Sequence, residues 1–223
     1  YSMFTMGNGD FTPASSAWQV ATSLTTGSGM LLVTLSITYV LSVLRAVTQA
    51  RSFASSVTGL GTKSEEYLQR GWSDDDESFE DLEIQLFRLG SQLDVVTEQH
   101  LSYPILHYYH SLRPRSATPR AVAILDDVLL LLETAVPEEY RVNDALTNTL
   151  ESSIENYLEV LETEAIDPSK ETPPRPDLEL LRELEVPTVA DETFDEALGS
   201  HRSRRQRLQA VVEQSAWDWP TDG

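Results

Sequence analysis

The sequence predicts an all-α protein in which one membrane-spanning helix is followed by a domain of amphipathic helices. The first observation is a run of 34 residues without a charged side chain, residues 11–44. The second is the recurrence of apolar residues every three to four positions in much of the remaining chain, which is the period of an α-helix. We find no alternation of apolar and polar residues that predicts strands, and no strand–helix–strand rhythm.

Residues 14–50 are expected to form the membrane helix. A spanning helix needs about 20 predominantly apolar residues, and residues 18–44 would extend about 40 Å as a helix. Arg45 and Arg51 follow the uncharged run, so the positive-inside rule places this end in the cytoplasm. A cleaved signal peptide carries its positive charge before the apolar stretch, which is the reverse order. We therefore expect a protein of the cell membrane whose C-terminal domain is cytoplasmic.

The expected membrane helix carries many hydroxyl side chains and two central glycines. The hydroxyls can bond to the helix backbone or to neighbouring helices. Gly27 and Gly29 permit close helix approach or a bend, and we predict a hinge or gate there. The helix should pack against other helices or line water. The hydroxyl residues are Thr22, Ser23, Thr25, Thr26, Ser28, Thr34, Ser36, Thr38 and Ser42.

The segment before this helix contains the most specific motif in the chain. Residues 5–13 read TMGNGDFTP, and a long apolar helix follows. This pattern resembles the selectivity-filter signature of potassium channels, TVGYGD followed shortly by proline. The resemblance covers about residues 1–50 and is to the two-transmembrane, pore-loop family of ion channels. Residues 1–13 would then be the end of a pore helix and the filter. Because the chain begins inside this pattern, we expect an N-terminal part to precede it.

The resemblance implies a cation-binding filter formed by Thr5, Met6, Gly7, Asn8 and Gly9, with Asp10 at the outer mouth. A filter replaces the water around a cation with inward-pointing backbone carbonyls. Glycine adopts the backbone conformations that this needs at little cost. A carboxylate at the mouth concentrates cations. One filter segment cannot surround an ion, so a homotetramer in the lipid bilayer is implied, with potassium or another monovalent cation permeating and no cofactor.

This sequence departs from the family pattern at two filter positions. Asn8 replaces the usual aromatic residue, and Met6 replaces the usual valine. The aromatic residue packs behind the filter, so Asn8 leaves the ion selectivity open, with potassium favoured. Two functions are therefore considered. The first is a cation channel subunit, and the second is a non-conducting, membrane-anchored helical adaptor with a degenerate pore loop.

The remaining chain is expected to form a cytoplasmic helical domain over residues 51–166, after a connector at 55–63. Ser64 is expected to cap the first helix. Further helices are predicted over residues 79–100, 117–136 and 142–163 from their apolar positions, with Pro104 and Pro137 as interruptions. Residues 167–176 contain four prolines and should form a linker. The last region, 167–223, is expected to be this linker and an acidic/basic helical tail with helices at 177–184 and 191–217, the last of them loosely held.

Two clusters in the domain are candidates for binding. His100, His107 and His110 lie near acidic residues, and either a metal site or a packed aromatic turn would suit them. Four arginines near the C-terminus could meet lipid phosphates or pair with the chain's own carboxylates; they are Arg202, Arg204, Arg205 and Arg207. No metal site is predicted with specificity. We find no nucleotide-binding or catalytic signature, so an enzyme is not expected.

The charge is distributed very unevenly. The net charge is −20, and residues 64–223 contain 35 acids against 13 bases. Such acidity argues against nucleic-acid partners, which require a basic face. The bases include two lysines, Lys63 and Lys170, and this acid-rich, lysine-poor composition indicates a halophilic source. The chain has no cysteine, which excludes disulfides and thiolate metal sites.

Overall fold

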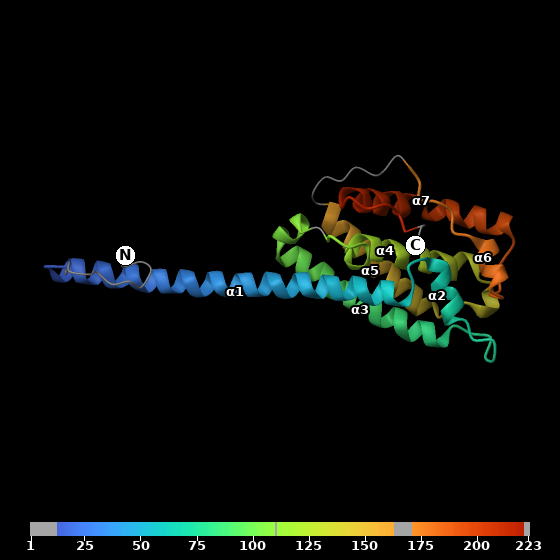
Figure 1. The fold of residues 1–223 in the computed structure, drawn as a ribbon, viewed down its shortest axis with the longest axis horizontal. Coiled ribbons are helices and arrows are strands. Elements are labelled where there is room, and N and C mark those ends of the chain that lie inside the picture. Colours follow the sequence, from blue (N-terminus) through green and yellow to red (C-terminus); the bar gives the residue numbers. More distant parts are fainter. Residues whose placement is uncertain (1–12, 110, 163–170, 221–223) are drawn as a thin grey trace. The chain divides into compact units, whose positions relative to one another are not determined.

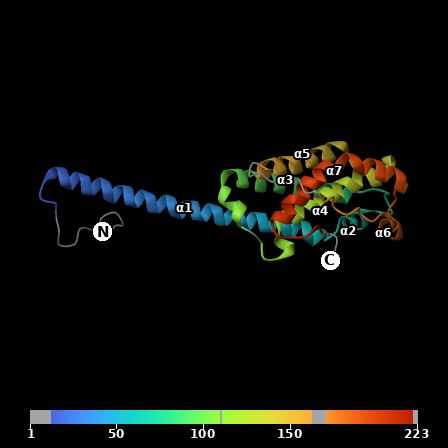
Figure 2. The ribbon, with the colours of Figure 1, turned by 90° about the horizontal axis from the view of Figure 1, so that it is seen from above.

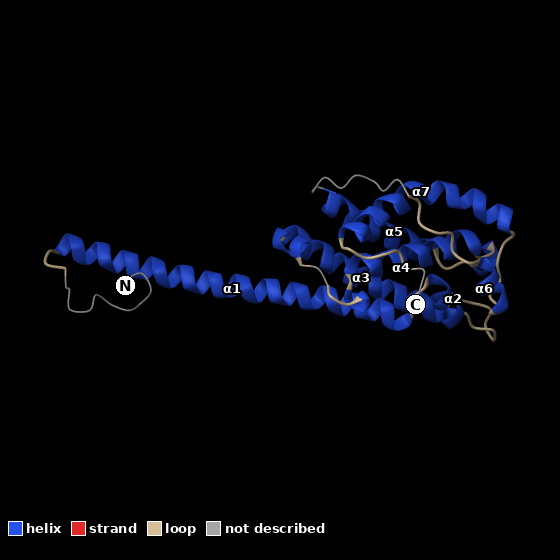
Figure 3. Ribbon diagram, turned by 45° about the horizontal axis from the view of Figure 1, so that its top comes forward, coloured by secondary structure: helices blue, strands red, loops and turns tan. Residues whose placement is uncertain are grey.

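The computed structural model describes residues 13–109, 111–162 and 171–220. The regular elements of these residues are helices, and the single β-type contact among them is an isolated bridge between Ser73 and Ser78 (Figure 3). The all-α prediction is therefore confirmed. The chain divides into two units, Tyr1–Ala46 and Val47–Gly223.

The membrane-helix prediction corresponds to helix α1, which runs from Ser16 to Leu60 (Figure 1). Its C-terminal end is about ten residues later than the predicted end at residue 50, so most of the expected connector at 55–63 is helical. The reason lies in packing inside the second unit. Phe53, Ala54 and Val57 are almost completely buried, and their spacing places them on one helical face. Burial of this apolar face outweighs the weak helix preference of the neighbouring Ser and Gly residues.

The described residues of the second unit form six further α-helices, and Figures 1 and 2 show them from two sides. They are α2 (Ser64–Gly71), α3 (Glu80–Ser102), α4 (Thr118–Leu130), α5 (Asp144–Glu162), α6 (Leu178–Glu183) and α7 (Asp191–Gln214). Short 3-10 turns lie at η2 (Pro104–Tyr108), η3 (Pro114–Ser116) and η5 (Glu138–Tyr140). The three long helices predicted in residues 79–163 are confirmed, as is the break at Pro104.

Helix α4 is the central element of the second unit. It packs against α2, α5 and α7, while α3 packs against α5 (Figures 1 and 2). Its residues from Ala121 to Leu130 are all buried, including Asp126 and Asp127. A helix that is buried on all sides must satisfy its polar groups internally. The apolar positions from which this helix was predicted did not indicate burial on all sides.

Helix α4 continues into one π-helical turn, η4 (Leu131–Ala135). The backbone N–H of Val136 donates to the carbonyl of Leu131 across five residues, at 3.1 Å. The carbonyl of Ala135 accepts a hydrogen bond of 2.8 Å from the N–H of Val189, so this backbone group is paired although the helix has ended. The π turn thus joins α4 to the loop before α7.

The N-caps of α2 and α6 differ in how far they follow from the sequence. The capping prediction for Ser64 was wrong, because Lys63 occupies the N-cap and the Ser64 hydroxyl donates to the Glu65 carboxylate instead. Thr62 lies just before this helix, and its backbone N–H donates a hydrogen bond of 3.1 Å to the carboxylate of Glu66, four residues later. Asp177 is a true N-cap of α6, and its Oδ1 accepts from the N–H groups of Glu179 and Leu180.

The described part of the C-terminal region belongs to the core, which corrects the expectation that the last helix, 191–217, is loosely held. Its described residues contribute eight buried apolar side chains to the same cluster as α3, α4 and α5. These side chains come from α6, the loop that follows it, α7 and the residues after α7. They are Leu178, Leu181, Val186, Phe194, Leu208, Val211, Val212 and Trp219.

Candidate functional site

The predicted filter lies outside the described residues. This applies to Thr5, Met6, Gly7, Asn8 and Gly9, and to Asp10 at the predicted outer mouth. Their roles therefore remain predictions. The described residues begin at Pro13, the last residue of the motif, and helix α1 begins three residues later at Ser16.

Within the first unit, helix α1 exposes apolar side chains around its whole circumference. Among the described residues, α1 is the one helix that is long and apolar enough to cross a membrane, and just 11% of its most apolar stretch is buried. The core helix of a water-soluble domain would instead be mostly covered. The large exposed apolar residues begin at Trp18 and end at Leu44, and they include Leu24, Leu31, Leu35, Ile37 and Leu41.

Seven hydroxyl groups between Thr22 and Thr38 donate hydrogen bonds to the helix's own backbone. Thr22 donates to the carbonyl of Trp18 at 2.8 Å, and Thr34 donates to that of Met30 at 2.9 Å. The same bond to the preceding turn is made by Ser23, Thr25, Thr26, Ser28 and Thr38. A paired hydroxyl is far less costly to transfer into an apolar medium than an unpaired one. These seven hydroxyl residues of α1 are therefore compatible with a hydrocarbon environment.

The two central glycines lie inside the uninterrupted helix. Gly27 is exposed, and no atom lies within 4 Å of the place where a Cβ would be. Gly29 is buried. Their prediction as a hinge or gate concerns a motion, and it stays a prediction. The open space at Gly27 shows that the described chain itself does not require a glycine there.

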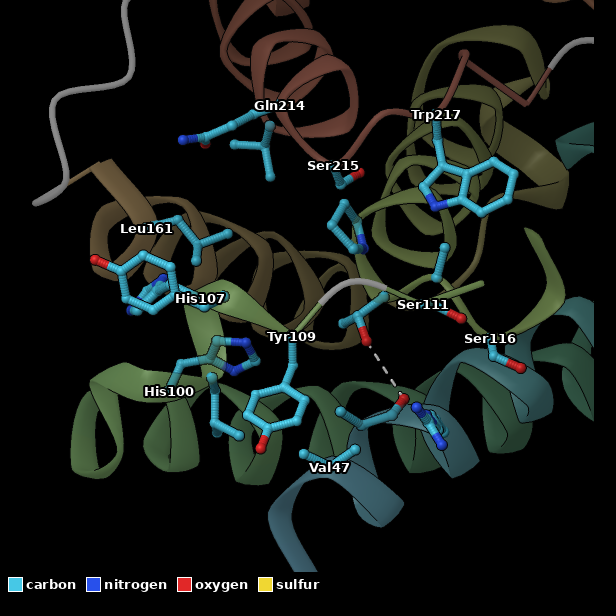
Figure 4. Close-up of a pocket in the computed structure, with 18 of the residues that line it drawn as sticks. Val47, His100, His107, Tyr109, Ser111, Ser116, Leu161, Gln214, Ser215 and Trp217 are labelled. Carbon is cyan, nitrogen blue, oxygen red and sulfur yellow. Dashed lines mark hydrogen bonds between the residues drawn. The ribbon is translucent and has the colours of Figure 1, made fainter. Parts of the chain in front are cut away.

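The second unit contains a cavity of about 340 Å³ between the first turns of its part of α1, the η2 region, and the ends of α5 and α7 (Figure 4). Val47, Ala50 and Arg51 line one side, and Gln214, Ser215 and Trp217 line another. The Thr118 hydroxyl donates to the carbonyl of Ala50 at 3.4 Å, the contact drawn as a dashed line in Figure 4. The sequence did not predict this cavity, because its walls come from four separate regions of the chain.

Two of the histidines considered as metal ligands line this cavity. His100 and His107 form an edge-to-face ring pair with centroids 5.5 Å apart, and His100 also contacts the ring of Tyr157. The Nδ1 atom of His100 lies 2.9 Å from the carbonyl oxygen of Val96. Burial lowers the pKa of His100 below its ordinary value. The described residues contain no group of three or more metal-ligating side chains, and His110 lies outside them. For His100 and His107 the geometry is that of a packed aromatic turn.

Three of the four clustered arginines pair with carboxylates of the chain itself. Arg204 donates to Asp126 at 2.6 Å and also to Glu151. Arg205 donates to Asp127 at 2.9 Å, and Arg207 pairs with Glu155. Arg202 is exposed. For Arg204, Arg205 and Arg207, the interpretation as internal ion pairs is confirmed.

Asp127 is a buried carboxyl group that contacts both Arg205 and Trp219. Its carboxylate accepts two bonds from Arg205 and one from the indole N–H of Trp219, at 2.9 Å. Burial raises the pKa of Asp127 to about 7, while the Arg205 charge opposes that rise. Arg205 also donates to the carbonyl of Pro174 at 2.7 Å. These contacts fasten α7 and the C-terminal loop to α4, and they indicate a structural role.

Comparisons with known proteins add one relative. No protein-family model matches the chain, and no solved structure matches it. The chain is 39% identical over 220 residues to YdjJ of Bacillus subtilis strain 168, which is described as an uncharacterized membrane protein. The match covers 99% of this chain, and the chain spans 64% of the relative's length.

Proposed function

We propose that this chain is part of a subunit of a tetrameric pore-loop cation channel in the cell membrane, with its helical unit in the cytoplasm. The observation that carries the proposal is the order of two features. A T-x-G-x-G-D-x-x-P motif ends at Pro13, and a helix with an exposed apolar circumference begins at Ser16. This is the order of filter and inner helix in the channel family that the sequence resembles.

The length and surface of α1 support membrane crossing. The stretch from Ser16 to Leu44 would measure about 43 Å at 1.5 Å per residue, which exceeds the hydrocarbon thickness of about 30 Å. A helix of this length crosses with some tilt or extends past one membrane face. The relative's description as a membrane protein points in the same direction for this chain.

In a tetramer, the small and polar residues of α1 would lie at the contacts between neighbouring subunits. In a bilayer, helices associate through small residues and hydroxyls, because lipid is as apolar as leucine. Gly27, Gly29 and the backbone-bonded Ser and Thr residues allow close approach of neighbouring inner helices. The remaining apolar side chains, such as Leu31 and Leu35, would face lipid.

The proposed filter would act through the backbone. Carbonyl oxygens of residues 5–9 would replace the hydration shell of a monovalent cation, and Gly7 and Gly9 would allow successive carbonyls to point inward. Asp10 would raise the local cation concentration at the mouth. Because irregular backbone at membrane depth must be buried in protein or line water, this arrangement requires the surrounding subunits.

The test is ion flux through the complete protein that carries this sequence, purified and reconstituted in planar bilayers. We expect a cation current with potassium permeant, its loss in Gly7→Ala and Gly9→Ala, and its retention in the matched control Met6→Val. The subunit number is measured on the same preparation by native mass spectrometry. Anion permeation, or a current unaffected by both glycine substitutions, would contradict the proposed filter.

One observation favours a second function, a non-conducting membrane-anchored adaptor. Asn8 stands where the channel family has an aromatic residue, so the filter would lack its usual lateral support. A correctly assembled tetramer that gives no current under any applied voltage would favour the adaptor. The same preparation thus discriminates the two functions.

A further inference from the structure

Residues 101–109 and 111–115 of the second unit differ in chemistry from the rest of the chain, and we call them the basic–aromatic segment. In a protein of net charge −20, no acid occurs between Glu98 and Asp126. The segment itself carries Arg113 and Arg115. A local excess of positive charge in so acidic a chain indicates a surface for an anionic partner.

The same segment exposes large apolar side chains. Leu112 is 94% exposed and Tyr108 76%, and Leu101, Ile105 and Tyr109 are exposed as well. Outside the membrane-type part of α1, the described residues hold three other exposed large apolar side chains, Ile84, Phe87 and Val95, all on α3. An exposed group of leucine, isoleucine and tyrosine beside arginines has the composition of a membrane-interface surface, where amphipathic rings sit at headgroup level.

The segment is held in place by one buried side chain and by hydrogen bonds to its backbone carbonyls. Leu106 is buried and anchors the η2 turn, and the Thr58 hydroxyl of α1 donates to the carbonyl of Arg115 at 3.1 Å. The Ser111 hydroxyl donates to the carbonyl of Arg113 at 3.1 Å. The side chains of Arg113 and Arg115 are exposed, and neither forms an ion pair with any described residue. The arginine charges are therefore available to a partner.

The segment lies beside the part of α1 that directly follows the uncharged run. Tyr108 and Tyr109 line the same cavity as Val47 and Arg51 (Figure 4). Arg51 is seven residues after Leu44, the last residue of that run, so chain connectivity keeps the two residues within roughly 25 Å of each other. A chain that crosses the membrane and leaves it near Leu44 therefore keeps this neighbourhood close to the membrane surface.

We propose that the basic–aromatic segment docks on the anionic phospholipid surface of the inner leaflet. Tyr108, Tyr109 and Leu112 would enter the interface, and Arg113 and Arg115 would contact lipid phosphates. The docking would hold the helical unit against the membrane at the exit of the proposed pore. This proposal depends on membrane crossing by α1, as proposed above, but does not depend on ion conduction.

The test uses the absence of cysteine in the chain, since a single introduced cysteine can be labelled without background. The complete protein is placed in nanodiscs of zwitterionic lipid, or of zwitterionic lipid mixed with phosphatidylglycerol, each containing a nitroxide-labelled phospholipid. An environment-sensitive fluorophore is attached at Leu112→Cys. The control for water exposure is Asp75→Cys, in the loop before the opposite end of α3, a helix about 35 Å long. The control for membrane crossing is Leu35→Cys.

We expect nitroxide quenching of the labels at Leu112→Cys and Leu35→Cys, and none at Asp75→Cys. Quenching at Leu112→Cys should be stronger with phosphatidylglycerol. It should fall to the zwitterionic level in Arg113→Gln/Arg115→Gln and in high salt, because salt screens the attraction.

Four outcomes overturn the proposal, and they separate it from the proposed function. A quenched label at Leu35→Cys with no quenching at Leu112→Cys rejects the docking and leaves membrane crossing intact. No quenching at Leu35→Cys rejects the crossing itself. Quenching that is equal in both lipids and unaffected by Arg113→Gln/Arg115→Gln rejects the role of charge. A label at Leu112→Cys that is equally shielded from water in lipid-free detergent assigns this surface to a neighbouring subunit.

Discussion

The indole N–H of Trp219 donates a hydrogen bond of 2.9 Å to Oδ2 of Asp127, a residue 92 positions earlier in the chain. Arg205 completes this site, since it bonds to Oδ1 of the same carboxylate and its guanidinium lies 5.5 Å from the centre of the Trp219 ring. One buried carboxylate of α4 thus joins α7 and the C-terminal loop to the centre of the helical unit.

Removal of Arg205 from its ion pair with Asp127 is expected to destabilise the helical unit strongly. Arg205→Ala leaves the Asp127 carboxylate buried without its cationic partner, and such changes cost about 3–5 kcal/mol in the free energy of unfolding. Denaturant unfolding at pH 8, followed by circular dichroism, measures this cost. The matched control is Arg202→Ala, an exposed arginine of the same helix, with an expected effect within about 0.5 kcal/mol. Equal effects of the two substitutions would contradict a special role of Arg205.

The Asp127 carboxyl also predicts a pH dependence. Its pKa is raised from 3.8 to about 7 in the folded protein, so between these values the folded state holds a proton that the unfolded state has lost. The stabilising contribution of this group is therefore complete below about pH 4 and is lost as the pH rises through 7. Relative to Asp127→Asn, the unmodified protein should lose free energy of unfolding between pH 4 and pH 7. Parallel pH profiles of the two proteins would show that Asp127 does not titrate in this range.

The last turns of α1 are expected to act as a core element. Phe53 is 1% exposed, and Phe53→Ala should cost about 3–5 kcal/mol in the free energy of unfolding, because it removes a buried ring and leaves a cavity. Ser52 precedes it and is exposed, so Ser52→Ala is the control and should have little effect. The two substitutions are compared by thermal unfolding in the same detergent. Similar midpoints would indicate that this part of α1 is not tightly packed.

The proposed filter predicts that the residue at position 8 influences ion selectivity. Asn8→Tyr restores the aromatic residue of the channel family and is expected to raise the potassium-to-sodium permeability ratio by about two- to tenfold, the equivalent of one aromatic contact. Reversal potentials under mixed-ion conditions measure this ratio. Asn8→Asp is the control, because it keeps the size of the side chain without adding a ring, and it should not raise the ratio. A ratio unchanged by the tyrosine would remove Asn8 from the determinants of selectivity.

Most of the helical elements could be predicted because their signal is local. Leu82, Leu86, Leu89 and Leu93 recur at helical spacing, and all of them are buried on α3 as expected. The errors arose at boundaries and caps. The Ser and Gly residues after Phe53 suggested a connector, whereas tertiary burial of Val57 keeps that stretch helical. Ser64 suggested a cap, but its hydroxyl bonds to Glu65 instead.

The functional residues divide in a different way. The filter motif was readable from residues 5–13 because a pore loop is a contiguous segment, and its role remains a prediction. The cavity near His100 could not be foreseen, since its walls come from α1, the η2 region, α5 and the end of α7. Likewise, the burial of Asp126 and Asp127 could not be foreseen, because aspartates are usually exposed to solvent.

The sequence by itself determined the all-helical class, the long uncharged stretch of α1 and the acidic character of the following unit. These properties depend on composition and on the period of 3.6 residues, which neighbouring positions set among themselves. The tertiary structure alone decided that α4 is the central helix, that Asp127 meets Arg205 and Trp219, and that the C-terminal region belongs to the core. A buried charge needs a partner at hydrogen-bond distance, and which distant residue supplies it depends on how the helices pack.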